Sequence, residues 1–206
     1  MELPVTLLND LNAIPRDRQV ALLMRHSARF PITDPEKMFE VPLTEEGVQM
    51  AEELGALIGE LFPCGRLIAS PVGRCLATAD AIARGAGWPL QAVADERISH
   101  PAIEPAWDAL NRGEINGVLP APVRAAMGLL LGDSAQTGPA LDVMVTHDTV
   151  VGTLAGCLLD SPVTGPHWPG FLEGIFLWRA ADGVHVLWRG EEKIFPETFF
   201  SLDAVP

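Results

Sequence analysis

Three short apolar runs, each followed by polar residues and then by a helical pattern, limit what this chain can fold into. They span residues 20–24, 67–69 and 141–145. Strands that alternate with helices are typical of an α/β domain with a mostly parallel central sheet. Such sheets bind ligands outside the carboxyl ends of their strands, so the residues directly after the three runs are the first candidates for a functional site.

The first run is followed by two arginines that flank a histidine. Arg25, His26 and Arg29 lie within the segment Met-Arg-His-Ser-Ala-Arg-Phe-Pro at residues 24–31. Guanidinium groups bind phosphate oxygens in pairs and keep their charge. A neutral imidazole among them can attack the phosphorus of a bound ester. The alternative is a solvated loop that contains these residues by chance.

The second run is followed by a predicted helix start that carries an arginine. Ser70 is expected to be the N-cap and Pro71 the first helical residue, which places Arg74 in the first turn. A cation is unfavourable there because the helix dipole is positive at that end. The placement fits an anion held between the helix and Arg74, unless Arg74 extends to solvent or to a surface carboxylate.

The third run is followed by His147 and Asp148, ahead of an apolar helix at residues 150–159. Taken alone, this pair is compatible with a core histidine and a helix cap. The three runs together bring a group of cationic and titratable side chains to one edge of the expected sheet. The group consists of Arg25, His26, Arg29, Arg74, His147 and Asp148.

The combined pattern resembles the histidine phosphatase superfamily. Residues 25–31 resemble the Arg-His-Gly-x-Arg-x-Pro motif of its histidine acid phosphatase branch, which also follows its second histidine with an aspartate. Residues 43–47, Leu-Thr-Glu-Glu-Gly, resemble a helix start of the family. Residues 70–79 resemble the segment that carries a further phosphate-binding arginine.

The resemblance implies a three-layer α/β/α sandwich, phosphoglycerate mutase-like, in one domain over residues 1–206 with a small inserted lid at 95–139. It implies a metal-independent phosphomonoester hydrolase that works without a cofactor through a phosphohistidine at His26. Arg25, Arg29, Arg74 and His147 would hold the phosphoryl oxygens. Asp148 would protonate the leaving group and later help to deprotonate water.

Two departures from the family pattern affect the expected site. The glycine after the first histidine is Ser27 here, which can donate a hydrogen bond to phosphate or narrow the pocket. The position of the mutase-like branch's glutamate is occupied by His100, which favours Asp148 as the proton donor. Glu104 and Asp108 in the lid segment are alternative donors, and His100 is either a substrate contact or an ordinary loop residue.

The same residues are compatible with other functions. A phosphohistidine protein phosphatase, a phosphoglycerate mutase-like phosphotransferase and a non-catalytic phosphate-ester binding protein would share the pocket. Specificity is expected to come from residues 31–42 and 95–139, where the sequence indicates no substrate beyond a small phosphorylated molecule.

Composition restricts partners and location. The net charge of −13 argues against nucleic acid and anionic membranes as partners. No apolar run is long enough to span a membrane, and the N-terminus lacks the features of a signal peptide, so a cytoplasmic location is expected. Cys64, Cys75 and Cys157 are expected to be free, buried thiols. A homodimer is one option that the sequence leaves open.

Periodicity and turn signals predict the remaining elements. Helices are expected at residues 5–14, 45–61, 72–86, 102–111 and 123–131. An edge strand is expected at residues 90–93, and a hairpin at 171–179 and 184–189 around Asp182 and Gly183.

Overall fold

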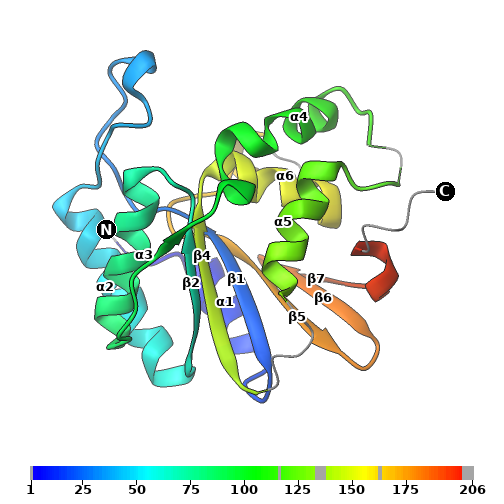
Figure 1. The fold of residues 1–206 in the computed structure, drawn as a ribbon, viewed down its shortest axis with the longest axis horizontal. Coiled ribbons are helices and arrows are strands. Elements are labelled where there is room, and N and C mark those ends of the chain that lie inside the picture. Colours follow the sequence, from blue (N-terminus) through cyan, green and yellow to red (C-terminus); the bar gives the residue numbers. More distant parts are fainter. Residues whose placement is uncertain (1, 116, 133–137, 162–163, 201–206) are drawn as a thin grey trace.

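The computed structural model describes residues 2–115, 117–132, 138–161 and 164–200. In this part of the chain one mixed sheet of seven strands carries helices on both faces (Figure 1). The strands are β1 Gln19–Arg25, β2 Cys64–Ala69, β3 Val93–Ala94, β4 Ala140–Thr146, β5 Gly174–Ala180, β6 Gly183–Trp188 and β7 Glu191–Phe195. The α-helices are α1 Val5–Ala13, α2 Glu45–Leu61, α3 Gly73–Ala86, α4 His100–Asn111, α5 Ala121–Leu131 and α6 Asp148–Leu159.

The sheet has a parallel half and an antiparallel half. The strand order is β3-β2-β4-β1-β5-β6-β7, and β3, β2, β4 and β1 are parallel. The antiparallel strands β5, β6 and β7 extend the sheet from β1. Since β4 lies between β1 and β2, the carboxyl ends of these three strands are adjacent, although their sequences are far apart.

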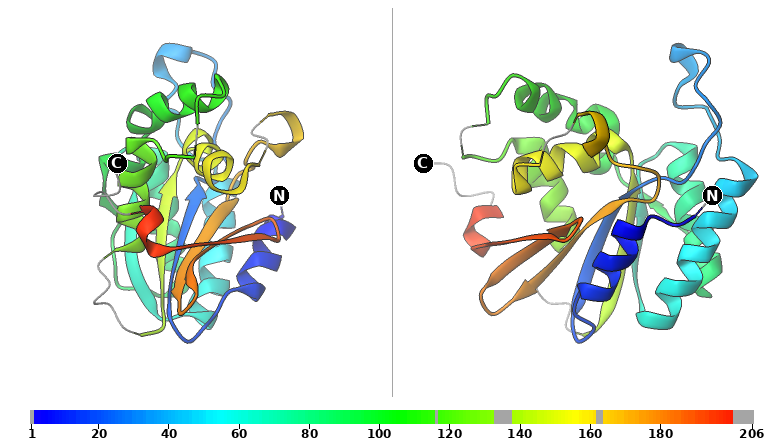
Figure 2. Two further views of the ribbon diagram at one scale, coloured as in Figure 1. Left: turned by 90° about the vertical axis from the view of Figure 1, so that its right-hand side faces the viewer. Right: turned by 180° about the vertical axis from the view of Figure 1, so that it is seen from behind.

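Side-chain alternation along the strands produces two hydrophobic cores. Val20, Leu22 and Met24 of β1 face one core, which contains side chains from α1, α2 and α3. Ala21 and Leu23 face the other, which contains side chains from α4, α5 and α6. The two further views show the resulting three layers, with helices on either side of the sheet (Figure 2).

The expected α/β sandwich is confirmed, and most elements lie within a few residues of their predicted bounds. The helix cap at residue 70 is wrong: α3 begins at Gly73 with Val72 as its N-cap. Ser70 instead continues the pairing of β2, because its backbone N–H donates to Val145 O at 2.8 Å. The edge strand lies later than predicted, at Val93–Ala94.

Strand β7 was not predicted from the sequence. It begins with Glu191, Glu192 and Lys193, which are exposed at the edge of the sheet and give no apolar signal. Charged edge strands are common because they prevent pairing with other chains. The strand is detectable only once the β5–β6 hairpin is in place to pair with it.

The segment at residues 95–139 contributes helices α4 and α5. Both pack into the core that α6 shares, and α4 lies against α6. Its role as a lid, like the single-domain organisation, stays a prediction. Residues 116 and 133–137 of this segment lie outside the described residues.

The three cysteines are free thiols, although only Cys75 is fully buried and Cys64 and Cys157 are half-buried. Among the described residues, no helix is both long and apolar enough to cross a membrane.

Candidate active site

Backbone pairing brings the three predicted strand ends together. Arg25 of β1 lies opposite Thr146 of β4, and the N–H of His26 donates to Thr146 O at 2.8 Å. On the other side of β4, Ser70 pairs with Val145 in the same way. His147 follows Thr146 directly, so this histidine and His26 lie side by side where the strands end.

Arg74 connects the two histidines. Its Nε donates to Nε2 of His26 at 2.9 Å, and its Nη2 lies 3.2 Å from Nδ1 of His147. Its Nη1 donates to the carbonyl oxygen of Met38 at 2.8 Å. The ring centroids of the two histidines are 5.6 Å apart, and all three side chains are buried. The first turn of α3 therefore positions one guanidinium between two imidazoles.

The hydrogen bonds of His26 define its protonation. Its Nδ1 lies 2.8 Å from the carbonyl oxygen of Ser27, which can only accept, so the proton is assigned to Nδ1. Arg74 can only donate, which leaves the lone pair on Nε2. Burial lowers the pKa of His26 to about 3, and the nearby charge of Arg74 acts in the same direction. The ring is therefore a neutral imidazole with its nucleophilic nitrogen facing Arg74.

His147 has the opposite tautomer. Its Nδ1 accepts from Arg74, so its proton is assigned to Nε2, which lies 3.3 Å from the Ser70 hydroxyl. Burial, together with Arg74, lowers the pKa of His147 to about 3. Since neither histidine is protonated near neutral pH, the local positive charge comes from the arginines.

Arg25 and Asp148, the chain neighbours of His26 and His147, form an ion pair. Arg25 Nη2 lies 2.9 Å from Asp148 Oδ2, and its Nη1 donates to Pro169 O at 2.7 Å. Trp168 Nε1 and the Thr149 backbone N–H also donate to the Asp148 carboxylate, at 3.1 and 2.9 Å. Burial on its own would raise the pKa of Asp148, but Arg25 and the two hydrogen bonds outweigh it and lower the pKa. The carboxylate is therefore ionised.

A cavity of about 190 Å³ opens in front of these groups. Part of its wall consists of arginine and histidine side chains. Another part is apolar and consists of Ile32, Met38 and Phe39 from the loop after β1. Beside them, His100 Nδ1 lies 2.8 Å from the Thr149 hydroxyl. The full lining is His26, Arg29, Ile32, Met38, Phe39, Arg74, His100, His147, Asp148 and Thr149. The size and the two guanidiniums suit a small anionic ligand.

Six of the sequence-predicted site residues line the cavity: His26, Arg29, Arg74, His100, His147 and Asp148. Two do not. Arg25 is paired with Asp148, and Ser27 is fully buried, with its hydroxyl donating to Gly47 O at 2.6 Å. Glu104 and Asp108, the alternative donors, are exposed on α4 and are not part of the lining.

Sequence reasoning missed the contacts of Met38, Thr149 and Trp168. Thr149 was within reach of prediction because it directly follows the His-Asp pair. Met38 and Trp168 act on the site through a carbonyl oxygen and an indole N–H, 36 and 20 residues away from their partners, and no local pattern indicates such contacts.

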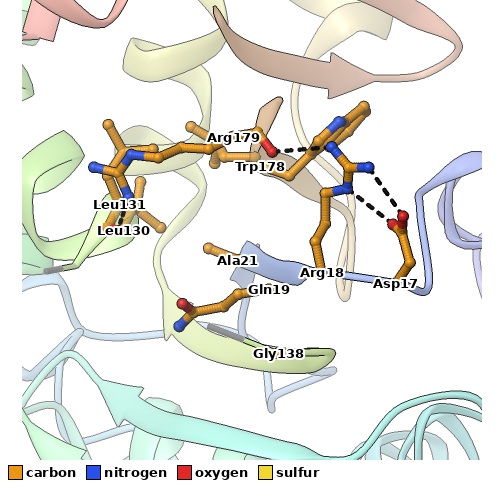
Figure 3. Close-up of a pocket in the computed structure, with 10 residues that line it drawn as sticks. Asp17, Arg18, Gln19, Ala21, Leu130, Leu131, Gly138, Trp178 and Arg179 are labelled. Carbon is orange, nitrogen blue, oxygen red and sulfur yellow. Dashed lines mark hydrogen bonds and ion pairs between the residues drawn. The ribbon is translucent and has the colours of Figure 1, made fainter. Parts of the chain in front are cut away.

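A second cavity, of about 220 Å³, lies at the amino end of β1, where Asp17, Arg18 and Gln19 line it (Figure 3). Its two arginines are bound to protein acceptors. Arg18 pairs with Asp17 and donates to Arg179 O at 3.3 Å, while Arg179 donates to Leu131 O (Figure 3). This cavity therefore lacks the histidine and arginine chemistry of the first.

The described residues contain no group of three His, Cys, Asp or Glu side chains arranged to hold a metal ion.

One family model matches just under half of the chain. Residues 22–117 match the model of the histidine phosphatase superfamily, branch 1. The predicted superfamily is confirmed, and the predicted acid phosphatase branch is wrong. The Arg-x-Pro and His-Asp patterns that pointed to that branch are only a few residues long, too short to separate branches. No protein with a curated description matches the chain.

Solved structures share the fold at low sequence identity. A phosphoserine phosphatase variant from Entamoeba histolytica, solved with phosphoserine, has a TM-score of 0.53 and 18% identity over 89% of this chain and 100% of that one. YhfR from Bacillus stearothermophilus gives the same four values. A mycobacterial glucosyl-3-phosphoglycerate phosphatase has a TM-score of 0.50 and 15% identity over 85% of this chain and 97% of that one. These likenesses establish the phosphoglycerate mutase-like fold.

Proposed function

We propose that this chain, which belongs to branch 1 of the histidine phosphatase superfamily, hydrolyses a small phosphomonoester through a phosphohistidine at His26. One observation carries the proposal. The lone pair of His26 Nε2 lies 2.9 Å from Arg74 Nε, at the wall of a cavity that two guanidiniums share. A neutral nucleophile beside a fixed cation is the arrangement that phosphoryl transfer to nitrogen requires.

In the first step His26 Nε2 attacks phosphorus, the P–N bond forms and the ester P–O bond breaks. Arg74 transfers its Nε–H from His26 Nε2 to a phosphoryl oxygen, which exposes the lone pair. Arg29 lies on the same cavity wall and neutralises further charge on the transferring group. The Ser27 carbonyl oxygen keeps the proton on Nδ1 and stabilises the positive charge that develops on the ring.

His147 and Arg25 support this arrangement. His147 holds Arg74 in place through Nδ1, and it lines the cavity that would hold the phosphoryl group. Arg25 contributes positive field rather than a direct contact, because its guanidinium is bound to Asp148 and Pro169. Asp148 in turn orients Arg25.

In the second step water attacks the phosphohistidine, the P–N bond breaks and its electron pair returns to His26 Nε2. Inorganic phosphate leaves. The low pKa of His26 favours this step, because the ring is a good leaving group when it does not need to retain a proton. The field of Arg74 also makes phosphate, or an analogue such as vanadate, a ligand of the free enzyme.

The experiment is hydrolysis of p-nitrophenyl phosphate together with trapping of the labelled protein. Wild type should turn over and yield an acid-labile, alkali-stable phosphoprotein, whereas His26→Ala should do neither. His185→Ala, a histidine variant on β6 beside Glu192 and Asp182, should behave as wild type. Turnover by His26→Ala would refute the proposal. Phosphate binding without turnover in wild type would indicate a non-catalytic binding protein.

The natural substrate is a separate question. A panel that contains phosphoserine, phosphorylated sugars and a phosphohistidine peptide distinguishes a small-molecule phosphatase from a phosphohistidine protein phosphatase. Transfer to a second acceptor rather than to water would indicate the mutase-like alternative. The cytoplasmic location stays a prediction of the sequence.

A further inference from the structure

The leaving group of the proposed reaction needs a proton, and the cavity restricts which side chain supplies it. Expulsion of an alkoxide without protonation is slow, and general acids typically contribute 10²- to 10⁴-fold, about 3–5 kcal/mol. The cavity wall offers three titratable groups besides the nucleophile within the described residues: His147, Asp148 and His100.

Asp148 is poorly placed to give a proton. Its carboxylate accepts from Arg25, from Trp168 and from the Thr149 backbone N–H, so both oxygens are occupied by donors. Protonation of this carboxylate would place a neutral acid 2.9 Å from the Arg25 guanidinium and remove the attraction between them. These contacts suit an ionised group that holds Arg25.

Both ring nitrogens of His147 also face protein partners. Its Nδ1 accepts from Arg74 and its Nε2 faces the Ser70 hydroxyl at 3.3 Å. A proton on Nδ1 would point at the Arg74 guanidinium, which cannot accept it. Glu104 and Asp108 are exposed on α4 outside the lining, so neither reaches the cavity in this arrangement.

His100 is the remaining group. It is the first residue of α4, and the Ser99 side chain caps that helix by accepting from the Ala102 N–H. Its Nδ1 lies 2.8 Å from the Thr149 hydroxyl on α6, and its ring centroid lies 5.8 Å from that of Phe39 and 6.5 Å from that of His147. Contacts with two helices and one loop therefore fix the ring at the cavity wall, with Nε2 as the nitrogen left for substrate.

We infer that His100, and not Asp148, is the proton donor of the reaction, an inference that rests on the proposed function. As His26 Nε2 attacks phosphorus and the P–O bond breaks, protonated His100 transfers its Nε2 proton to the leaving oxygen. Its Nδ1–H donates to the Thr149 hydroxyl throughout. In the second step neutral His100 takes a proton from the attacking water while the P–N bond breaks, which restores the starting state.

The charges that face His100 act in opposite directions. Arg29 and Arg74 are the cations that share the cavity wall with His100, and Asp148 is the anion. His147 faces the same ring as a neutral group.

The test compares esters whose leaving groups differ in their need for a proton. His100→Gln should lower kcat/KM for an alkyl phosphate by about 10²- to 10³-fold, but less than about 5-fold for p-nitrophenyl phosphate. Added imidazole should restore alkyl ester turnover in His100→Ala. Thr149→Val removes the hydroxyl that faces His100 Nδ1. It should also lower kcat/KM for the alkyl phosphate more than for p-nitrophenyl phosphate, but by a smaller factor than His100→Gln.

Two control variants complete the design. Asp148→Asn should lower kcat/KM for both esters by the same factor, because it disturbs Arg25 rather than the proton transfer. Glu104→Gln, on the same helix as His100, should match wild type. The inference would be overturned if His100→Gln lowered kcat/KM equally for both esters. It would also be overturned if Asp148→Asn lowered kcat/KM selectively for the alkyl phosphate.

Failure of this inference is distinguishable from failure of the proposed function. Phosphohistidine formation from p-nitrophenyl phosphate should persist in His100→Gln, because attack by His26 on a good leaving group does not need the donor. If labelling and turnover are absent from wild type as well, the proposed function fails. If wild type is active and His100→Gln shows no dependence on the leaving group, only the donor assignment fails.

Discussion

Nε of Arg74 donates to Nε2 of His26 at 2.9 Å, so the cation that is expected to bind phosphate also covers the nucleophilic nitrogen. The sequence raised a difficulty with a cation in the first turn of α3, which a bound anion would explain. The structure provides a different reason. Each of the three guanidinium nitrogens has one acceptor, which is Met38 O or an imidazole nitrogen, so the guanidinium has partners before any ligand binds.

Arg74→Lys should therefore be a severe change. An ammonium group is a point charge that cannot reach Met38 O and both histidines in one plane. We expect kcat/KM for p-nitrophenyl phosphate to fall by about 10²- to 10³-fold, which corresponds to about 3–4 kcal/mol of transition-state stabilisation. Stabilisation of the fold by added phosphate, measured as a rise in Tm, should also be lost.

A matched control lies on the same helix. Arg84 is exposed near the end of α3, where it pairs with Glu52. Arg84→Lys keeps the charge and should leave both kinetics and the phosphate effect unchanged. If Arg74→Lys retained most of the activity, the planar contacts of Arg74 would not be what organises the site.

The two buried histidines predict how stability depends on pH. In the fold the pKa values of His26 and His147 are about 3, whereas an unfolded histidine titrates near its ordinary value of about 6.5. Between these values the unfolded chain binds more protons, so stability is full above about pH 6.5 and is lost progressively as the pH falls toward 3. At about pH 5 each histidine should lower the free energy of unfolding by about 1–2 kcal/mol relative to its value above about pH 6.5.

Urea unfolding at about pH 7.5 and about pH 5 measures this effect. Wild type should lose more stability across the interval than His26→Gln, which has only one of the two buried imidazoles. His185 should contribute with the opposite sign, because Glu192 and Asp182 raise its pKa despite its partial burial. Equal pH dependence in wild type and His26→Gln would contradict the assignment of a neutral His26.

Ser27 stands where the family motif has a glycine, and replacing it tests what the serine contributes. Its hydroxyl donates to Gly47 O, and its backbone N–H donates to the Thr78 hydroxyl at 3.1 Å. Ser27→Gly should cost about 1 kcal/mol of stability, from the lost hydrogen bond and the added freedom of the unfolded chain. It should change kcat/KM by less than about 3-fold. A large gain in activity would mean that the hydroxyl narrows the pocket.

The sequence predicted the parts of the site that depend on strand ends. His26, Arg74 and His147 follow three apolar runs, and parallel pairing of those runs is enough to bring them together. Arg25 and Ser27 were predicted as direct ligands, but their side chains are bound to protein groups instead. Their partners, Asp148 and Gly47, are known only from tertiary structure.

Glu173 and Arg189 should support the site from a distance. Glu173 accepts from Thr6, from the Gly170 N–H and from Arg189, and Arg189 also donates to Trp168 O at 3.2 Å. These bonds fix the turn whose indole N–H and carbonyl oxygen bind Asp148 and Arg25. Glu173→Gln should lower stability by about 2 kcal/mol, and kcat should fall more than KM rises.

The control for this pair is Glu197→Gln. Glu197 pairs with Arg179 at 3.0 Å, but both side chains are at least one third exposed. Its loss should cost less than about 1 kcal/mol and leave kinetics unchanged. If Glu173→Gln destabilised the fold without any kinetic effect, the turn would hold its shape by other contacts and the positioning role would be wrong.

Close contact of α2 with α3 gives a last prediction, about the scaffold that carries Arg74. A Cβ on Gly55 would lie 2.1 Å from Ile82 O, whereas a Cβ on Gly128 in α5 would meet no atom within 4 Å. Gly55→Ala should therefore separate the two helices, cost about 2–3 kcal/mol in urea unfolding and reduce kcat/KM through displacement of Arg74. Gly128→Ala should instead stabilise by about 0.5–1 kcal/mol, because alanine has the higher helix propensity. Equal effects of the two substitutions would show that the backbone contact between α2 and α3 does not determine where Arg74 lies.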